Sequence, residues 1–193
     1  LGVAVDVVPM TDDPVRTMVD TDRGVLPFQT WFVKERCGPA YRSARFDGIE
    51  RARPHPALVA ALEDPELGAV ILCPSNPFVS VAPILALDGV RERLMRCTAP
   101  RIAVTPIIGG QAVKGPAAKM FTELGLQPTA YAVAEQYRDL IDAFVLDAVD
   151  AAQADAIDGL GMRAHTTDTL MRDEADRARL AREVLGFIGL PST

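Results

Sequence analysis

The sequence predicts an α/β fold in which a mostly parallel sheet carries flanking helices, with one β-hairpin set apart from it. From residue 56 onward, short apolar runs alternate with segments of helical length. This alternation is typical of parallel strands joined by right-handed crossovers. Nearer the start, Asp22-Arg23-Gly24 lies between two apolar runs and is a turn signal that predicts the hairpin. The length of 193 residues predicts one domain, residues 1–193.

The first third of the chain is expected to hold a strand, the hairpin and an irregular stretch, with residues 15–53 as an insertion in the domain. The hairpin carries Phe28, Trp31 and Phe32, and strand alternation places the last two on opposite faces, so at least one of them is expected to be buried. The expected segments in order are a buried strand at Gly2–Met10, hairpin arms at Val15–Asp20 and Val25–Val33, and a polar stretch at Arg36–Arg53 with an edge strand at Arg45-Phe46.

The rest of the chain is expected to alternate between strands and helices. The last helix has Asp173 and Glu174 near its start, where the helix dipole favours negative charge. Strands are expected at Leu67–Cys73, Arg101–Thr105, Ala143–Leu146 and Arg163–Thr166. Helices are expected at Pro56–Glu63, Val79–Arg96 with a break near Asp88-Gly89, Gly115–Leu124, Ala130–Asp139, Ala151–Leu160 and Asp173–Ile188.

Composition excludes several classes of protein. Hydrophobic residues make up 49% and charged residues 24% of the chain, which excludes a disordered protein. The net charge is −6 and no basic run occurs, which argues against a nucleic-acid coat. Three isolated cysteines without CxxC spacing argue against a disulfide framework or a zinc site. No apolar stretch is long enough to span a bilayer and no basic region opens the chain, so the cytoplasm is the expected location.

Ligands of open parallel sheets bind at the carboxyl ends of the strands, so the loops after the strands are the candidate sites. The first such loop, residues 73–80, leaves a strand and enters a helix. Its backbone amides would suit an anion, with Ser75, Asn76 and Ser80 as side-chain donors. Serine and asparagine before a helix equally serve as plain N-caps, and spacing alone leaves both interpretations open.

The second candidate loop is residues 106–116. Gly109-Gly110 allows positive φ and a close approach of the backbone, and Lys114 lies just before a helix, where a diphosphate would rest. The GxxxxGK[ST] pattern is absent, so a Walker-type ATPase is not supported. By itself this loop is better explained as a flexible loop with a solvated lysine. Two such loops after successive strands favour phosphate binding, with Lys114 as the expected catalytic cation.

Two further loops have weaker signals. Asp12 and Asp13 follow the first expected strand and are weak candidates for holding Mg²⁺, although capping the turn before Pro14 is the better interpretation. The segment 166–173 follows the last strand and is better explained by helix capping. The two histidines have no partner spacing that suggests a metal site or a Ser-His pair.

The motifs in these loops resemble a known family. Residues 74–94 are PSNPFVSVAPILALDGVRERL and residues 105–125 are TPIIGGQAVKGPAAKMFTELG. Together with the shorter motifs TDDPVRT, FQTWFV, FVLD and TDTLMRD, they occur in the same order in the 2-phospho-L-lactate transferase family of coenzyme F-420 biosynthesis, the CofD-like proteins. The resemblance covers nearly the whole chain and implies a Rossmann-like fold.

The resemblance also implies an activity and its ligands. The donor would be a guanosine diphosphate-linked three-carbon acid, either lactyl or enolpyruvyl. The acceptor would be the deazaflavin 7,8-didemethyl-8-hydroxy-5-deazariboflavin, whose terminal ribityl hydroxyl attacks the phosphorus and releases GMP. The family implies Mg²⁺ as cofactor and a homodimer, and no nucleic acid or membrane as partner. This chemistry needs positioning and charge neutralisation more than a covalent nucleophile, which agrees with a site of amide-rich loops and one lysine.

One departure from the family is that the Gly-rich strand and loop that open its members are absent here. The chain therefore resembles the C-terminal portion of the enzyme, and by itself is expected to keep part of the guanosine diphosphate site and lose catalysis. The alternative is a non-catalytic regulator that binds nucleotide sugars, as in the related gluconeogenesis-factor family. The corresponding loop there resembles GPGSLYTS, whereas here it is CPSNPFVS, which favours the transferase.

Overall fold

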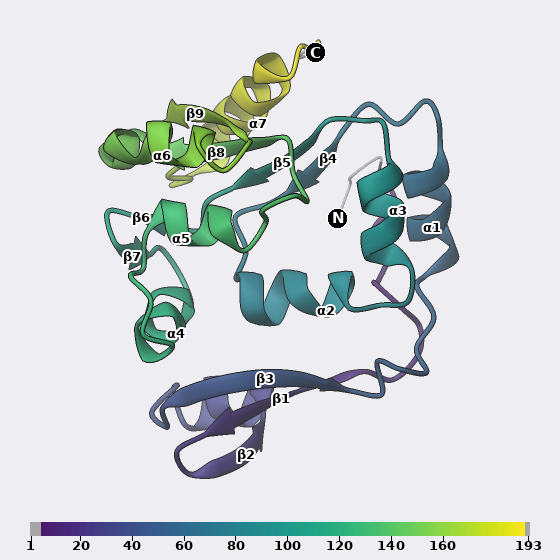
Figure 1. The fold of residues 1–193 in the computed structure, drawn as a ribbon. Coiled ribbons are helices and arrows are strands. Elements are labelled where there is room, and N and C mark those ends of the chain that lie inside the picture. The colour runs from purple at the N-terminus through teal and green to yellow at the C-terminus, as the bar shows by residue number, and fades with distance from the viewer. Residues whose placement is uncertain (1–4, 192–193) are drawn as a thin grey trace.

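The computed structural model describes residues 5–191 and shows a parallel sheet and an antiparallel hairpin sheet, with helices between and around them (Figure 1). The parallel sheet has the strand order β4-β5-β8-β9, so each strand pairs with its neighbour in the chain. Its strands are β4 (Val70–Leu72), β5 (Arg101–Val104), β8 (Ala143–Asp147) and β9 (Arg163–Thr167). This confirms the α/β fold class with its parallel sheet and hairpin excursion.

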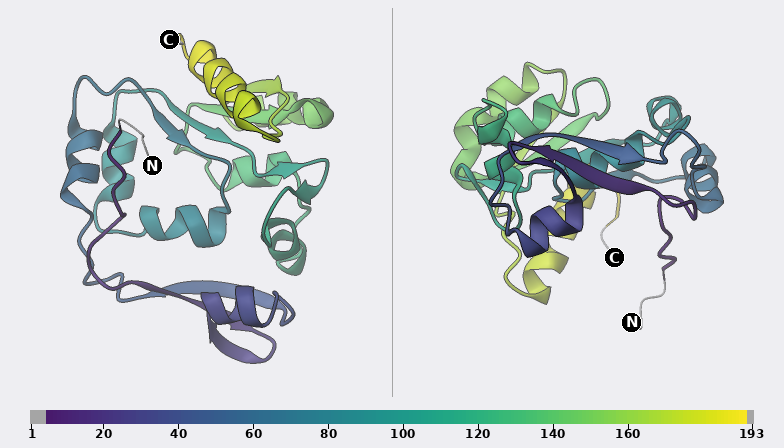
Figure 2. Two further views of the ribbon diagram at one scale, coloured as in Figure 1. Left: turned by 180° about the vertical axis from the view of Figure 1, so that it is seen from behind. Right: turned by 90° about the horizontal axis from the view of Figure 1, so that it is seen from below.

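Alternation along the central strands divides the core into two layers. Successive residues of a strand point to opposite faces of the sheet, and both faces of β5 and β8 are covered. On one face, Ile102 and Val145 pack with Leu180 and Val184 of α7 (Glu174–Phe187). Figure 2 shows α7 on this side of the sheet. On the other face, Phe144 belongs to the larger core formed with the remaining helices.

Capping side chains and a glycine with positive φ set several of the helix boundaries. His55, Thr129 and Asp173 each cap a helix through a side chain that accepts a backbone N–H. Gly89 has φ +67° and divides the long helical segment, which confirms the predicted break. The remaining helices are α1 (Pro56–Glu63), α2 (Ala82–Leu85), α3 (Val90–Arg96), α4 (Ala117–Glu123), α5 (Ala130–Glu135) and α6 (Ala154–Asp158), with a π-helical turn at Pro77–Val81 and a 3₁₀ turn at Ala148–Gln153.

The hairpin sheet has β1 (Arg16–Thr21) at its centre, paired antiparallel with β2 (Gly24–Pro27) and β3 (Tyr41–Asp47). Trp31 is fully buried beside this sheet, and its indole N–H donates to the Pro39 carbonyl at 2.9 Å. The small core of the sheet includes Met120 of α4, so the excursion packs against the main body of the chain.

Two sequence predictions for the first third were wrong. Residues 5–10 of the expected strand Gly2–Met10 form no strand, and residues 1–4 lie outside the described part. Val7 is 81% exposed, and no strand within the described range pairs with this run. An apolar segment without a partner strand is not stabilised as a β-strand. The second hairpin arm ends at Pro27, and Thr30–Lys34 forms a π-helical turn. The expected edge strand at Arg45-Phe46 is confirmed, and pairing along β1 extends it to the seven residues of β3.

The prediction that at least one of Trp31 and Phe32 is buried is confirmed, but the reason is not strand alternation. Trp31 is buried while Phe32 is 38% exposed, and both lie in the π-helical turn. Phe28 stacks on Phe32 with ring centroids 5.4 Å apart. The assignment of residues 1–193 to one domain with an insertion at 15–53 stays a prediction.

Candidate functional site

A cavity of about 200 Å³ lies at the carboxyl ends of the parallel strands. Its wall includes Pro74 after β4, Thr105 after β5 and Thr169 after β9, together with Lys114 and Arg177. The carboxyl ends of parallel strands meet at one edge of a sheet, and this edge is the usual ligand site of such folds. The loops after β4 and β5 therefore border the same cavity, as the sequence predicts.

A larger cavity lies at the opposite end of the strands. It measures about 310 Å³ and is lined by segments that precede β4 and β5, including Asp64 and Thr98. Its lining holds as many carboxylates as cations, and one of the cations, Arg93, pairs with Glu63 at 2.8 Å. The cavity at the carboxyl ends is the better candidate because its lining contains the cations Lys114 and Arg177 and no carboxylate.

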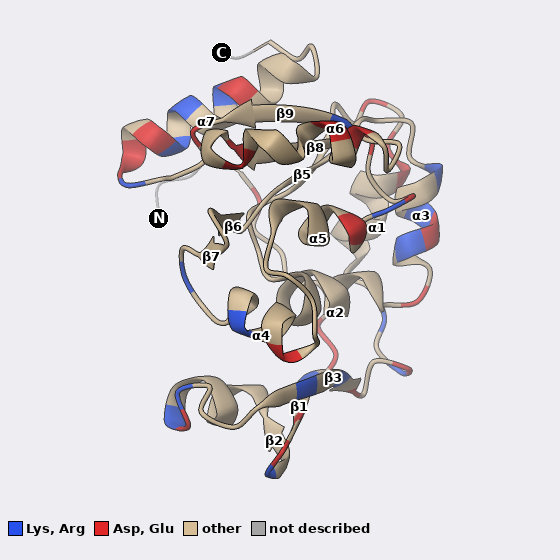
Figure 3. Ribbon diagram, turned by 60° about the vertical axis from the view of Figure 1, so that its left-hand side comes forward, with Lys and Arg blue, Asp and Glu red and all other residues tan. Residues whose placement is uncertain are grey.

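Lys114 and Arg177 supply two positive charges to the cavity at the carboxyl ends. Both side chains are exposed, and within residues 5–191 neither lies within 4.0 Å of a carboxylate oxygen. Figure 3 shows the blue segment in the loop between β7 and α4 and the blue segments of α7. Unpaired cations at a concave site attract anions, because no neighbouring carboxylate cancels their field. Sequence reasoning found Lys114 and missed Arg177, since nothing in the sequence brings α7 to this loop.

The loop that carries Lys114 begins with a tight hairpin. Strands β6 (Ile107–Ile108) and β7 (Gln111–Ala112) pair antiparallel, which leaves Gly109-Gly110 as the two central residues of the turn. Their φ angles are +56° and +80°, the pattern of a type I′ turn, which glycine adopts without strain. The positive φ predicted for these glycines is confirmed. The Gly109 N–H is already occupied, because it donates to Asp150 Oδ2 at 2.8 Å.

Two buried aspartates follow β8, and sequence reasoning assigned no role to either. Asp147 ends the strand and Asp150 lies in the 3₁₀ turn beyond it, at 5% and 7% exposure. Asp147 Oδ1 accepts from the Val149 N–H at 3.1 Å, and its Oδ2 accepts from the N–H and hydroxyl of Thr169. An acidic residue directly after a fully apolar strand is the signal that could have found Asp147.

The pKa of Asp147 is lowered despite burial. Burial acts first and raises the pKa, because a desolvated carboxylate is disfavoured. The hydrogen bonds from Val149 and Thr169, with the positive charge of Arg179, together outweigh burial and hold the pKa below its ordinary value. Asp147 is therefore an ionised clamp that fixes the segment after β9, which lines the cavity.

The first predicted loop has the geometry of a helix cap. Asn76 Oδ1 accepts from the N–H groups of Phe78 at 2.9 Å and Val79 at 3.4 Å. Its amide nitrogen lies 3.1 Å from the Met120 sulfur. The capping interpretation of Asn76 is thus confirmed. Ser75, Asn76 and Ser80 are not among the residues that line the cavity, so their role as donors to an anion stays a prediction.

The contacts of Asp12 and Asp13 are those of a turn. Asp13 Oδ2 accepts from the Arg53 N–H at 2.8 Å, and Asp12 Oδ2 lies 3.7 Å from His55 Nε2. Neither aspartate lines the cavity. Among residues 5–191 no group of three or more His, Cys, Asp or Glu side chains is arranged to hold a metal ion. The backbone amide of Arg53 engages one oxygen of Asp13, and the role of Asp12 and Asp13 as weak candidates for holding Mg²⁺ stays a prediction.

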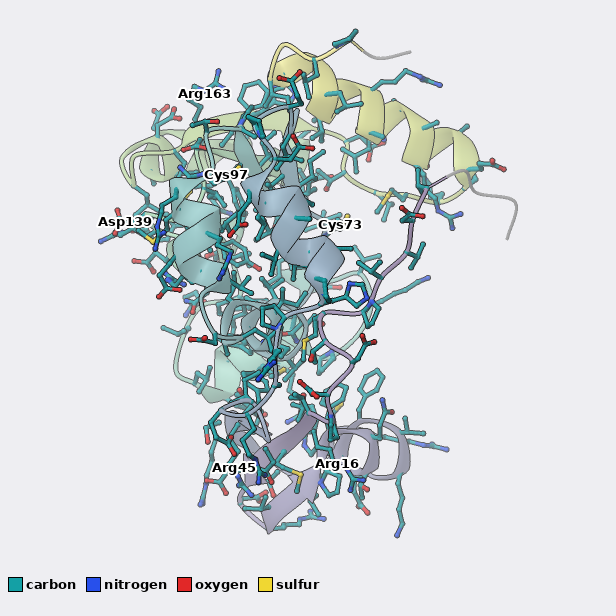
Figure 4. The ribbon with its side chains drawn as sticks, turned by 90° about the vertical axis from the view of Figure 1, so that its right-hand side faces the viewer. Arg16, Arg45, Cys73, Cys97, Asp139 and Arg163 are labelled. Atoms are coloured by element: carbon teal, nitrogen blue, oxygen red, sulfur yellow. The ribbon has the colours of Figure 1, made fainter. Side chains whose placement is uncertain are left out.

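The cysteines form no pair in the described range. Cys37, Cys73 and Cys97 are free thiols, and Figure 4 shows Cys73 and Cys97 on separate segments. Burial raises the pKa of the Cys37 thiol, which keeps it protonated and unreactive. No helix in residues 5–191 combines the length and the apolar character that a membrane span requires.

Comparison with known proteins identifies a family. The family model described as 2-phospho-L-lactate transferase CofD matches residues 1–184. The chain is 36% identical over 184 residues to the 2-phospho-L-lactate transferase of Methanosarcina mazei, covering 95% of this chain and 59% of the relative. It is 40% identical over 179 residues to that of Halobacterium salinarum, covering 93% and 50%. It is 33% identical over 186 residues to the phosphoenolpyruvate transferase of Streptomyces griseus, covering 94% and 58%.

Solved structures support the fold. Two crystal structures of a UPF0052 family protein from Bacillus halodurans superpose with TM-scores of 0.61 and 0.59 at 11% and 12% identity. They cover 92% and 90% of this chain and 61% and 60% of that protein. At this identity the likeness concerns the fold alone. The chain spans between half and three fifths of the length of the curated relatives described above.

Proposed function

Because this chain belongs to the 2-phospho-L-lactate transferase CofD family, we propose that it forms the donor-binding portion of such a transferase. The donor would be a guanosine diphosphate-linked three-carbon acid, and the acceptor the ribityl hydroxyl of 7,8-didemethyl-8-hydroxy-5-deazariboflavin. The observation that carries the proposal is the cavity at the carboxyl ends of β4, β5 and β9 with its two unpaired cations, Lys114 and Arg177.

The reaction would be a displacement at phosphorus. The acceptor hydroxyl oxygen forms a bond to the phosphorus that bears the three-carbon acid, and the bond from that phosphorus to the bridging oxygen breaks. The bridging oxygen leaves with GMP, and the hydroxyl proton is lost to solvent. Negative charge grows on the bridging oxygen, so a cation beside it stabilises the departing group. Lys114 is assigned this role, and Arg177 is assigned to the second phosphate.

The surrounding residues would keep these cations in place. Asp147 holds the segment of Thr169 against the end of β8, through hydrogen bonds of 2.8 and 3.0 Å. The Thr105 hydroxyl donates to the Ile107 carbonyl at 3.0 Å and accepts the Ile107 N–H at 3.1 Å, which fixes the exit from β5. A pre-formed wall needs little rearrangement when an anion binds, which favours affinity.

The identity of the three-carbon acid stays open. The archaeal relatives have names that refer to phospholactate, and the Streptomyces griseus relative has a name that refers to phosphoenolpyruvate. Magnesium, a homodimer and a cytoplasmic location stay predictions from the family resemblance. The displacement above is described with residues of this chain alone. A regulator without catalysis remains the alternative, and it is distinguished by the experiment below.

The test is calorimetric titration of the chain with GDP, and with ADP as the matched control, followed by measurement of GMP release in the presence of donor and deazaflavin. Binding of GDP together with GMP release identifies a complete transferase site. Binding without release identifies a donor-binding portion whose acceptor contacts lie in the part of the relatives that this chain does not span. Absence of GDP binding overturns the proposal.

A further inference from the structure

A chain of partly buried hydrogen bonds ties the glycine turn to the helices behind it. Asp150 Oδ2 accepts from the Gly109 N–H at 2.8 Å, and its Oδ1 accepts from Gln153 Nε2 at 3.0 Å. Gln153 Oε1 in turn accepts from the Tyr131 N–H at 2.9 Å. Three segments far apart in sequence are thereby joined, namely the β6–β7 turn, the 3₁₀ turn after β8 and the start of α5.

The arrangement requires a hydrogen-bond acceptor at both oxygens of residue 150. Both oxygens of Asp150 face N–H donors, one on Gly109 and one on Gln153. A carboxylate accepts at both oxygens, whereas an amide has one acceptor and one donor. In Asp150→Asn one N–H group would therefore face another across a site where residue 150 is only 7% exposed. An unsatisfied polar group in such a place is costly.

A buried negative charge beside an anion site is unfavourable in itself. The Gly109 turn leads directly into the segment that carries Lys114, which lines the cavity. By charge alone, Asp150 would repel a diphosphate bound there. Its presence is consistent with a geometric role that outweighs this repulsion.

We propose that Asp150 is a positioning residue that acts through Gly109 to hold the β6–β7 turn, and with it Lys114, in the geometry that binds a nucleoside diphosphate. The proposal rests on the function proposed above. Gln153 orients the Asp150 carboxylate by donating to it, and links it to α5 by accepting from the Tyr131 N–H. The charge of Asp150 and its positioning role predict opposite changes in the affinity for an anion when Asp150 is replaced. Loss of the negative charge would strengthen anion binding, whereas loss of positioning would weaken it.

The experiment uses four variants of the chain. Asp150→Asn removes one acceptor, and Gln153→Glu places two carboxylates together. The double variant Asp150→Asn/Gln153→Glu exchanges amide and carboxylate. The amide at position 150 then accepts from Gly109 and donates to the carboxylate at position 153, which accepts from Tyr131 in turn. All three hydrogen bonds are restored with the charge moved. Asp155→Asn is the control for charge, because Asp155 is exposed at the start of the neighbouring α6.

Two measurements are made on each variant, the hydrogen exchange rate of the Gly109 amide by NMR and the affinity for GDP by calorimetry. Asp150→Asn is expected to exchange faster at Gly109 and to bind GDP about tenfold more weakly, the effect of one lost hydrogen bond to a charged group. The double variant is expected to recover both quantities. The Asp155→Asn control is expected to change neither beyond twofold.

The outcomes separate the two proposals. Unchanged exchange at Gly109 in Asp150→Asn overturns the positioning role, and so does faster exchange with equal or tighter GDP binding. Failure of the double variant to recover either quantity also overturns it. If the unmodified chain binds no GDP, the proposed function is wrong, and so is the claim that Asp150 supports binding of a nucleoside diphosphate. The hydrogen exchange rate at Gly109 still decides whether Asp150 holds the β6–β7 turn.

Discussion

The Asp147 carboxylate accepts two hydrogen bonds from Thr169, one from the backbone N–H at 2.8 Å and one from the hydroxyl at 3.0 Å. Both residues are buried, at 5% and 4% exposure. The pair joins the end of a central strand to the segment after the edge strand β9. This segment is part of the cavity wall, so the stability of the fold and the shape of the site depend on the same contact.

Removing the hydroxyl of Thr169 tests this contact. Thr169→Val keeps the shape and the backbone hydrogen bond and loses one donor to a buried carboxylate. The free energy of unfolding is expected to fall by about 1.5–3 kcal/mol. Urea denaturation at pH 7 measures it. Thr166→Val is the control, because Thr166 is exposed on β9, and an equal loss in both variants would contradict the special role of the pair.

The ion pair of Asp142 and Arg101 predicts a dependence of stability on pH. The Arg101 guanidinium donates to both carboxylate oxygens, at 2.6 and 3.0 Å, and these hydrogen bonds lower the pKa of Asp142. The contribution to stability is therefore present above the pKa of the unfolded chain, about 3.9, and is lost as pH falls through the lower folded value. Asp142→Asn is expected to cost about 1 kcal/mol at pH 7, since this carboxylate is partly exposed.

The measurement is the free energy of unfolding of both proteins at pH 7, 5 and ~3, where the last value lies below the unfolded pKa. The difference between the chain and Asp142→Asn should be constant between the first two and shrink at the third. Asp139→Asn, at an exposed position, should follow the unmodified chain throughout. A difference that grows toward acid would contradict the assignment.

Two glycines with nearly equal φ separate backbone strain from crowding. Gly24 has φ +97° and a Cβ added there meets no atom within 4 Å, whereas at Gly48, with φ +94°, it would lie 2.5 Å from the Pro14 carbonyl oxygen. Gly24→Ala is expected to cost about 1–2 kcal/mol through strain alone. Gly48→Ala should cost roughly 1–3 kcal/mol more through the clash. Thermal and urea unfolding of the two variants compare them, and equal losses would refute the close approach at Gly48.

Lys114→Ala tests the first cation. If Lys114 contacts a phosphate, its loss removes a charge-assisted hydrogen bond, so GDP should bind about 1.5–3 kcal/mol more weakly, or roughly ten- to hundredfold. Lys34→Ala is the control, because Lys34 is an exposed lysine on the hairpin excursion. Titration calorimetry in low salt measures both affinities. Equal affinities for the Lys114→Ala and Lys34→Ala variants would leave Lys114 as a solvated side chain.

Arg177→Ala tests the second cation in the same way. We expect a loss of GDP affinity similar to that of Lys114→Ala, and a smaller loss for GMP, which has one phosphate fewer. Arg182→Ala on the same helix is the control, because Arg182 is exposed and does not line the cavity. An equal loss for GMP and GDP would place Arg177 away from the second phosphate. Higher salt should reduce the effect, since both cations are solvent-exposed.

Local chemistry in the sequence determined much of the fold. The alternation of apolar runs and helical segments predicted all four parallel strands. The central strands β5 and β8 are buried on both faces of the sheet, whereas the edge strands β4 and β9 are only partly buried. Gly89 and the turn at residues 22–24 were predicted from conformational preference alone, and both lie where expected. The positive φ of Gly109-Gly110 was also evident, since few other residues adopt it without strain.

Only the tertiary structure decided which polar groups share the site. Arg177 and Lys114 come from segments far apart in sequence, and Asp150 reaches Gly109 across 41 positions. The apolar run at the start of the chain remained without strand pairing in residues 5–10, and the polar residues 41–47 became a strand. A strand needs a pairing strand, and a binding site needs side chains, from segments distant in sequence. A local sequence pattern carries no information about which distant segment packs against it. The sequence by itself therefore determined the elements, and packing decided the pairings.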